Sequence, residues 1–434
     1  MEESGIRTDS GIQEIGESRS ISGMTKAKGL SVMTAAVFIA GEMAGSGILA
    51  LPRATANAGW FGVALILIIA WASAKACLCL SDSWIMIEKK WPEYQNLHVR
   101  DPYPTIAGHS IGPRMKKLSS VMMDLQLFGV TLVFLLLCAE LVASLIASHV
   151  SISYCSLIVV IGIILCPLTW FGSPADFPPV AFGAMISSVL SSIIVIIILA
   201  MQSGDKIPQS QHSAPSFKSF LLGLSTIAFA YGGAVTIPTF QNDMKKKEQF
   251  PSAVNLGFAM MLGLYLPISL GSYVIIGDSV VDNVLESCDS GTATDIVNVL
   301  MAFHVFCAFL IVINPLNQDL EQQIKVEHSF NLKRCAFRSI LCAILIFTGL
   351  TVPKFGKILN LVGSATVIPQ TFIFPPWFYY NLINITGEKK MTLSMTIQLA
   401  SIAILGVITM IAATYFAITD LIEPGSFTKP CYIH

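Results

Sequence analysis

The chain has 434 residues, of which 54% are hydrophobic and only 12% are charged, with a formal net charge of -1 and a mean hydropathy of +0.69. A soluble core cannot absorb that much apolar surface, so these values exclude an ordinary soluble domain and predict an integral membrane protein. The balanced charge provides no basic face for nucleic acid. One G-x-S-x-G, at 108–112, lacks the strand that a nucleophile elbow needs. We therefore expect no enzyme, no metal site and no cofactor beyond a coupling ion.

The chain begins with a polar segment, and a series of apolar windows follows it. Residues 1–28 are rich in Ser, Glu and Gly and predict a disordered tail. Windows of about 20 apolar residues, enough to cross the hydrocarbon of a bilayer, then predict eleven helices at 30–51, 59–80, 119–147, 154–171, 182–201, 218–239, 253–276, 293–313, 337–352, 357–379 and 393–416. These windows define a transmembrane domain over 29–416. An odd number of spans places residues 417–434 on the side opposite the N-terminus.

The distribution of Lys and Arg predicts the orientation. Basic residues gather at 89–117, 245–247, 325–338 and 389–390, which all lie on one side if the predicted spans alternate. Basic residues favour the cytosolic side of a membrane. We therefore expect a cytosolic N-terminal tail and a short non-cytosolic C-terminal tail. The sequence does not distinguish a plasma membrane from a lysosomal, vacuolar or vesicular one.

This orientation places Cys155 and Cys288 on the non-cytosolic, oxidising side. Thiols on that side can form disulfides, so a bond between Cys155 and Cys288 is expected. The alternatives are that both thiols stay unpaired, or that Cys431 in the C-terminal tail takes the place of one partner.

Two glycine-rich segments interrupt membrane-length helices. Residues 41–52 read G-E-M-A-G-S-G-I-L-A-L-P, and residues 231–238 read Y-G-G-A-V-T-I-P, each with a glycine five places before a proline. Glycine weakens a helix interior by about 1 kcal/mol and admits strained backbone angles. Paired interruptions in two halves of a membrane chain are typical of a substrate site built from half-helix ends. Close packing of helices is the alternative reason for such glycines.

Three stretches resemble the amino acid/auxin permease family, within the amino acid-polyamine-organocation transporters. They are G-E-M-A-G-S-G-I-L-A-L-P-R-A-x-x-x-A-G-W from Gly41, F-A-Y-G-G-A-V-T-I-P-T-F-Q-N-D-M-K from Phe229, and V-P-K-F-G-K-I-L-N-L-V-G-S from Val352. The resemblance implies an all-α secondary transporter of amino acids with leucine-transporter-like architecture. Its two inverted five-helix repeats would cover about 30–201 and 218–379, with broken helices 1 and 6 and an extra eleventh helix at 393–416. Protons or sodium would drive it.

The broken helices supply the predicted substrate contacts. The unwound first helix would offer backbone N–H groups and a helix N-terminus to the substrate carboxylate, and the unwound sixth helix would offer unpaired carbonyls to the ammonium group. The expected binding residues are Ala44, Gly45, Ser46, Gly47, Phe229, Ala230, Tyr231, Gly232 and Gly233. The compact glycines and Tyr231 favour a small or medium neutral amino acid.

Ionisable residues at membrane depth are costly and need a reason. Glu42 is a candidate for proton coupling, because a carboxyl in an apolar site can load and release a proton; a structural carboxyl is the alternative. His304 is a second candidate, with a hydrogen-bonded packing histidine as its alternative. Lys75 and Asp124 are expected to form a structural ion pair. Residues 297–320 contain no Ser or Thr for a sodium site of this architecture, which favours protons.

The sequence therefore predicts a secondary active amino acid transporter, a proton symporter that works by alternating access. Sodium coupling is one alternative, and a transporter-like sensor that signals without net flux is another. The expected partners are the amino acid substrate and membrane lipid, and the sequence does not identify protein partners.

Overall fold

The computed structural model describes residues 29–434, apart from 96–98, 100, 148–149, 172–177, 327–329, 424–428 and 434. The predicted N-terminal tail therefore lies outside the described residues, as does part of the C-terminal tail. The described chain is helical, with two isolated bridges, Leu30 to Met244 and Gln211 to Gly277, and no strand. The all-α prediction is confirmed for this part of the chain.

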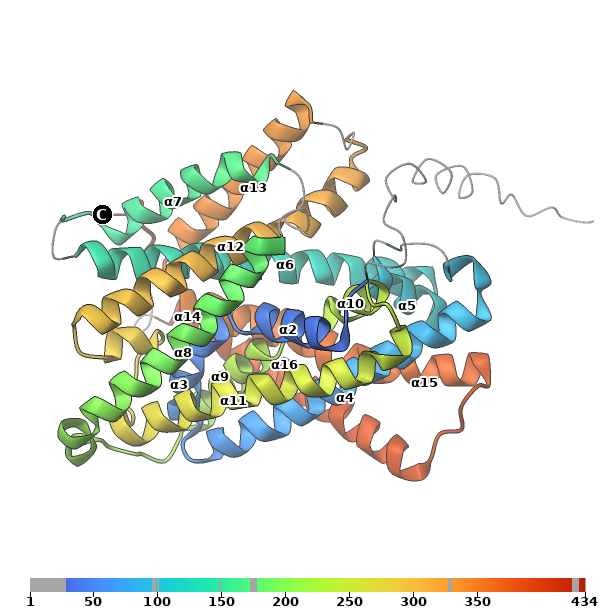
Figure 1. Ribbon diagram of the computed structural model, residues 1–434, viewed down its shortest axis with the longest axis horizontal. Coiled ribbons are helices and arrows are strands. Elements are labelled where there is room, and N and C mark those ends of the chain that lie inside the picture. The colour runs from blue at the N-terminus through green and yellow to red at the C-terminus, as the bar shows by residue number, and fades with distance from the viewer. Residues whose placement is uncertain are drawn as a thin grey trace, which may run out of the picture.

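The helices form one bundle (Figure 1). They are α2 (Val32–Met43), α3 (Ser46–Ala58), α4 (Phe61–Lys90), α5 (Pro102–Ser110), α6 (Pro113–Ile146), α7 (Tyr154–Thr169), α8 (Pro178–Lys206), α9 (Phe217–Ala230), α10 (Ile237–Asn242), α11 (Phe250–Ile276), α12 (Thr292–Gln323), α13 (Leu332–Thr351), α14 (Phe355–Val362), α15 (Phe374–Thr386) and α16 (Leu393–Ile422). Short turns η6 (Gly233–Val235) and η8 (Val284–Ser287) and two π-helical stretches, η9 (Gly363–Val367) and η10 (Pro369–Ile373), join some of them.

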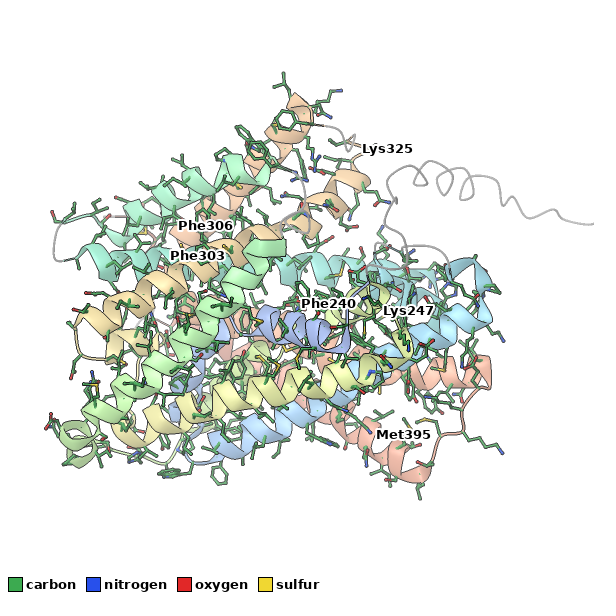
Figure 2. The ribbon with its side chains drawn as sticks, in the orientation of Figure 1. Phe240, Lys247, Phe303, Phe306, Lys325 and Met395 are labelled. Atoms are coloured by element: carbon green, nitrogen blue, oxygen red, sulfur yellow. A yellow bond between two sulfur atoms is a disulfide. The ribbon has the colours of Figure 1, made fainter. Side chains whose placement is uncertain are left out.

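Within the described residues, nine helices are long and apolar enough to cross a membrane, or ten if α2 and α3, bent by 58°, count as one span. The predicted window at 154–171 coincides with α7, which is apolar but only 16 residues long. The outer surface carries large apolar side chains, such as Phe303 on α12, which is 48% exposed (Figure 2). Such a surface suits lipid rather than water.

The packing places the two broken helices inside the bundle. The helix α3 packs along α9 and α11, while α2 packs along α11, and α12 packs along α6 and α8. Every residue of α9 from Leu221 to Ala230 is buried. The outer helix α16 instead leaves most of its residues partly or fully exposed. The glycine-rich breaks therefore lie where the bundle is most enclosed.

The expected disulfide between Cys155 and Cys288 is wrong. Cys155 bonds to Cys431, with a Cα–Cα distance of 5.7 Å, and Cys288 is a free thiol. The reason is the docking of the C-terminal tail on α13. The backbone N–H of Cys431 donates to Leu350 O at 2.8 Å, and this contact brings Cys431 to the start of α7.

The expected ion pair between Lys75 and Asp124 is also wrong, since no salt bridge joins them in the described structure. Asp124 lies on α6, which packs along α12 rather than along α4. Its Oδ2 atom lies 3.5 Å from Gln323 Nε2, which also donates to Asp319 at 2.9 Å. Asp124 thus belongs to a polar contact between α6 and α12.

Candidate functional site

The first break separates α2 from α3. The helix α2 ends at Met43 and α3 begins at Ser46, with Gly45 at the N-cap of α3. A glycine N-cap has no side-chain acceptor, so the N–H groups of the first turn are not capped by a side chain. A Cβ atom on Gly45 would lie 3.0 Å from His304 Nε2 and 3.2 Å from Phe134, so close packing also favours glycine here.

The second break follows α9, where the chain unwinds through Tyr231 and Gly232 before η6 and α10. Its carbonyls are not unpaired, which corrects the sequence-based expectation. Four of them accept hydrogen bonds from neighbouring groups: Phe229 O from Gly232 N at 2.9 Å, Ala230 O from Tyr265 Oη at 3.0 Å, Tyr231 O from Ser73 Oγ at 3.2 Å, and Gly232 O from Gln126 Nε2 at 3.1 Å.

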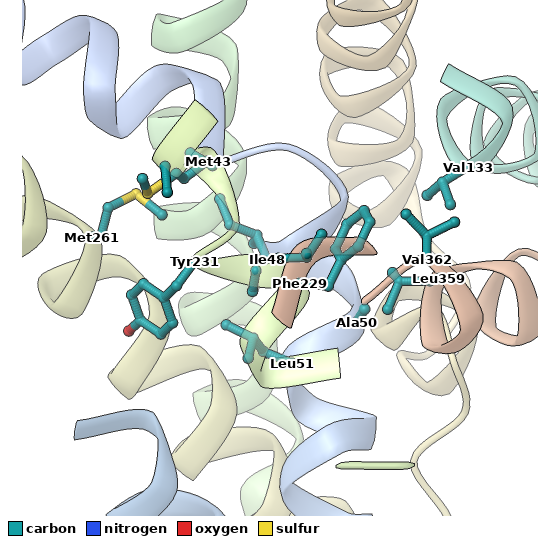
Figure 3. Close-up of a cluster of buried hydrophobic side chains, with 14 of the residues drawn as sticks. Met43, Ile48, Ala50, Leu51, Val133, Phe229, Tyr231, Met261, Leu359 and Val362 are labelled. Carbon is teal, nitrogen blue, oxygen red and sulfur yellow. The ribbon is translucent and has the colours of Figure 1, made fainter. Parts of the chain in front are cut away.

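A small cavity of about 60 Å³ lies between the two breaks. It is lined by Glu42, Met43, Gly45, Ser46, Gln126, Leu127, Val130, Phe134, Phe229, Gly232, Gly233, Val235, Val312 and Val367. Five of the nine predicted binding residues are in this lining, and Ala44, Gly47, Ala230 and Tyr231 are not. Figure 3 shows that Phe229 and Tyr231 point to opposite sides of their segment. The structure therefore brings both breaks to one cavity.

Among the described residues that line the cavity, Glu42 is the only one with an ionisable side chain. It lies in the last turn of α2, and its Oε2 atom is 2.8 Å from the hydroxyl of Thr236, which follows η6. The same hydroxyl lies 2.8 Å from Gly233 O. Among the described residues, no ion pair involves Glu42. Glu42 thus joins the first break to the second without a cationic partner.

His304 lies behind the cavity rather than in its lining. It is buried in α12, where its Nδ1 atom lies 2.8 Å from Ala184 O and 2.7 Å from Ser188 Oγ, both in α8. A carbonyl can only accept, so a hydrogen bond to Ala184 O requires the hydrogen on Nδ1, and in that tautomer of the neutral ring Nε2 faces Gly45 as an acceptor. This geometry fits the packing histidine, and a role in proton transfer stays a prediction.

Two site residues were missed by sequence reasoning. Tyr265 of α11 places its hydroxyl 2.6 Å from Met43 O and 3.0 Å from Ala230 O, so one side chain contacts both breaks. Gln126 of α6 lines the cavity, and its Oε1 atom accepts from Gln370 Nε2 at 2.7 Å. An amide inside an apolar window was a usable signal for Gln126. A tyrosine in such a window carries no comparable signal.

Comparison with known proteins identifies related sequences. A family model described as transmembrane amino acid transporter protein matches residues 28–419. The chain is 22% identical over 394 residues to amino acid transporter AVT1C of Arabidopsis thaliana, covering 88% of this chain and 68% of that protein. It is 25% identical over 403 residues to lysine histidine transporter-like 1 of the same organism, covering 88% and 86%.

Solved structures show a similar fold. MhsT in complex with L-phenylalanine has a TM-score of 0.52 at 13% identity, and the match covers 88% of this chain and 98% of that one. The inward-facing conformation of Mhp1 has a TM-score of 0.57 at 11% identity, covering 92% and 91%. At these identities the likeness concerns the fold alone.

Proposed function

The chain belongs to the transmembrane amino acid transporter family, and we propose that it carries small to medium neutral amino acids by alternating access, driven by protons. The observation that carries this proposal is the cavity at the meeting point of the two helix breaks, with Glu42 in its wall. Broken helices that meet at one site can bind a substrate with their exposed ends. A carboxyl in the same wall gives the proton a place to bind.

The substrate carboxylate would lie at the start of α3. Gly45 and Ser46, at the start of α3, line the cavity, and the positive end of a helix dipole stabilises an anion there. The rest of the lining is mainly apolar, with Val130, Val312 and Val367 among its members. A wall of this kind suits an uncharged side chain.

The same proposal includes an architecture of eleven spans, with α7 as the short one, arranged as two inverted five-helix repeats followed by α16. The coverage of the leucine-transporter-like MhsT structure supports it. We also propose a cytosolic N-terminus, supported by the clusters of basic residues and by the Cys155–Cys431 disulfide on the side expected to be oxidising. Plasma, lysosomal, vacuolar and vesicular membranes are all compatible with these features.

The test is uptake of a panel of labelled amino acids into proteoliposomes that contain the purified protein. The panel is measured with an imposed proton gradient, with an imposed sodium gradient and with neither. Accumulation driven by the proton gradient alone is expected, and Glu42→Gln should abolish it. Asp124→Asn is the matched control, because it neutralises a carboxyl of α6 that is outside the cavity lining.

Three outcomes would contradict parts of the proposal. Binding without accumulation under any gradient would favour a sensor. Accumulation driven by sodium alone would retain transport and refute the ion assignment. Equal loss of accumulation in Glu42→Gln and Asp124→Asn would remove the special role of Glu42.

A further inference from the structure

We infer that Glu42 is also the counter-charge for the ammonium group of the substrate, so that amino acid and proton occupy this carboxyl in turn and cross the membrane in opposite directions. The inference rests on the proposed function and replaces the symport expected from the sequence. It follows from which polar groups at the two breaks already have a hydrogen-bond partner.

The acceptors of the second break are occupied. Tyr231 O and Gly232 O each accept a hydrogen bond from a side chain of a neighbouring helix, at 3.2 and 3.1 Å, and Ala230 O shares the single hydroxyl hydrogen of Tyr265 with Met43 O, at 3.0 and 2.6 Å. A buried carbonyl that already has a donor gains less from a new one than an unpaired carbonyl does. These carbonyls therefore offer an incoming ammonium group little compensation for the water that it loses.

At the first break, by contrast, the backbone N–H groups at the start of α3 have no side-chain cap. Gly45 provides no side-chain cap to the first turn of α3, so its N–H groups favour an anion. An amino acid carries its carboxylate and its ammonium group on the same carbon atom. When the carboxylate lies against Gly45 and Ser46, the ammonium group must lie in the adjoining wall, and Glu42 lies in that wall three residues before the cap.

The positive charge of the substrate ammonium group also requires a negatively charged partner. An ammonium ion that enters an apolar cavity without a counter-charge loses its hydration, and nothing in the cavity compensates for that loss. Among the described residues of the lining, Glu42 is the only one with an ionisable side chain, and one of its oxygens is already oriented by Thr236 at 2.8 Å. When the ammonium group pairs with the Glu42 carboxylate, these two charges cancel. The remaining net charge of the occupied cavity is that of the substrate carboxylate at the α3 N-terminus.

The surroundings contain no competing charge. The groups that face Glu42 or the break beside it include the Thr236 hydroxyl from the segment after η6, the Cys77 thiol from α4, the Tyr265 hydroxyl from α11 and the His304 imidazole from α12. The helices α8, α10 and α11 also pack against α2, and no ion pair joins them to Glu42 in the described chain. Thus no side-chain cation of the described residues competes with a proton or an ammonium group for this carboxylate.

The exchange balances one proton against one amino acid. Deprotonated Glu42 binds the ammonium group, and the loaded protein carries the amino acid to the other side. There the amino acid leaves and Glu42 takes up a proton. The protonated, neutral site returns and releases its proton on the side where the next amino acid binds. No covalent bond of the substrate is broken, and the proton crosses the membrane in the direction opposite to that of the amino acid.

The test begins with counterflow of labelled amino acids in proteoliposomes without any ion gradient, which identifies a substrate. Equilibrium binding of that amino acid to the purified full chain is then measured from about pH 4.5 to about pH 8.5, a range in which a free amino acid keeps both its charges. Competition for one carboxyl predicts that the apparent affinity falls on acidification, approaching about tenfold per pH unit on the acid side. The carboxylic acid that lacks the amino group should compete for the site without this pH dependence.

The variants separate a charge effect from a structural one. Glu42→Gln should bind weakly and without pH dependence. Glu42→Asp should retain the pH dependence at reduced affinity, and so should Thr236→Val, which removes the hydroxyl and leaves the carboxyl. If a variant fails to fold, the pH dependence of substrate binding to the wild-type protein still tests the inference. An affinity that rises or stays constant on acidification would overturn the inference and leave transport intact, whereas absence of counterflow for every amino acid would overturn the proposed function itself.

Discussion

Replacement of Tyr265 by phenylalanine tests whether one hydroxyl holds the two helix breaks together. The hydroxyl lies 2.6 Å from Met43 O, at the end of α2, and 3.0 Å from Ala230 O, at the end of α9. The carbonyls at a helix C-terminus have no partner within the helix. The two carbonyls share the single hydroxyl hydrogen, so Tyr265→Phe removes one donor from a buried site, while the ring and its packing remain.

The magnitude follows from the number of groups left unpaired. Loss of one partner of a buried hydrogen bond costs about 1 to 3 kcal/mol, because the remaining group stays dry. Since about 1.4 kcal/mol changes an equilibrium constant tenfold, the expected loss of substrate affinity is about 5-fold to 100-fold if the breaks must hold their geometry to bind. The free energy of unfolding should fall by a similar amount.

Tyr231→Phe is the matched control. Tyr231 is as buried as Tyr265, and the two rings are in contact at a centroid distance of 5.2 Å. The Tyr231 hydroxyl, however, has no hydrogen-bond partner within the described residues. Its removal should therefore leave the free energy of unfolding unchanged or slightly raise it.

The measurements are thermal unfolding of both variants in one detergent and the KM for uptake of the best substrate from the panel. Tyr265→Phe should melt at a lower temperature and show a raised KM, and Tyr231→Phe should match the wild type in both. Equal behaviour of the two variants would refute the reasoning, since it would mean that the hydrogen bonds to Met43 O and Ala230 O contribute nothing measurable.

Two further predictions concern the ends of the bundle. Arg338 is fully buried, and its Nη2 atom lies 3.1 Å from Glu321 Oε2. Glu321→Gln removes this counter-charge and should lower the free energy of unfolding by about 3 to 5 kcal/mol, measured by thermal unfolding. An unfolding temperature equal to that of the wild type would contradict this prediction. Cys155→Ser should free the C-terminal tail for proteolysis and cost about 2 to 4 kcal/mol, since it opens the bond to Cys431. Cys288→Ser is its control and should have no such effect.

Much of the fold could be predicted from local patterns. Apolar windows located the membrane-length helices because the length of hydrocarbon that a helix must cross is fixed. The glycines at 45 and 232 marked both breaks, since a glycine at these positions weakens a helix wherever it folds. The shortness of α7 was visible in the sequence too, as a window bounded by polar residues on both sides.

The contacts between distant segments could not be predicted in this way. The partner of Cys155 depends on how the tail docks on α13, where the Tyr432 ring stacks on Phe347 at a centroid distance of 5.9 Å. The partner of Asp124 depends on which helix faces α6. Both are properties of helix packing, and the spacing of residues along one helix does not encode the neighbour of that helix.

The donors that cap the second break belong to the same class of unpredictable contacts, and they change the chemistry of the site. Ser73, Gln126 and Tyr265 come from three different helices, and each donates to one carbonyl of the segment 230–232. Seen in the sequence alone, both breaks offer backbone groups to a substrate. In the folded chain the first break keeps the more available groups, because no side chain caps the first turn of α3. This asymmetry assigns the carboxylate of an amino acid to the backbone of α3 and leaves its ammonium group to a side chain, which is why the proton and the substrate meet at the same carboxyl.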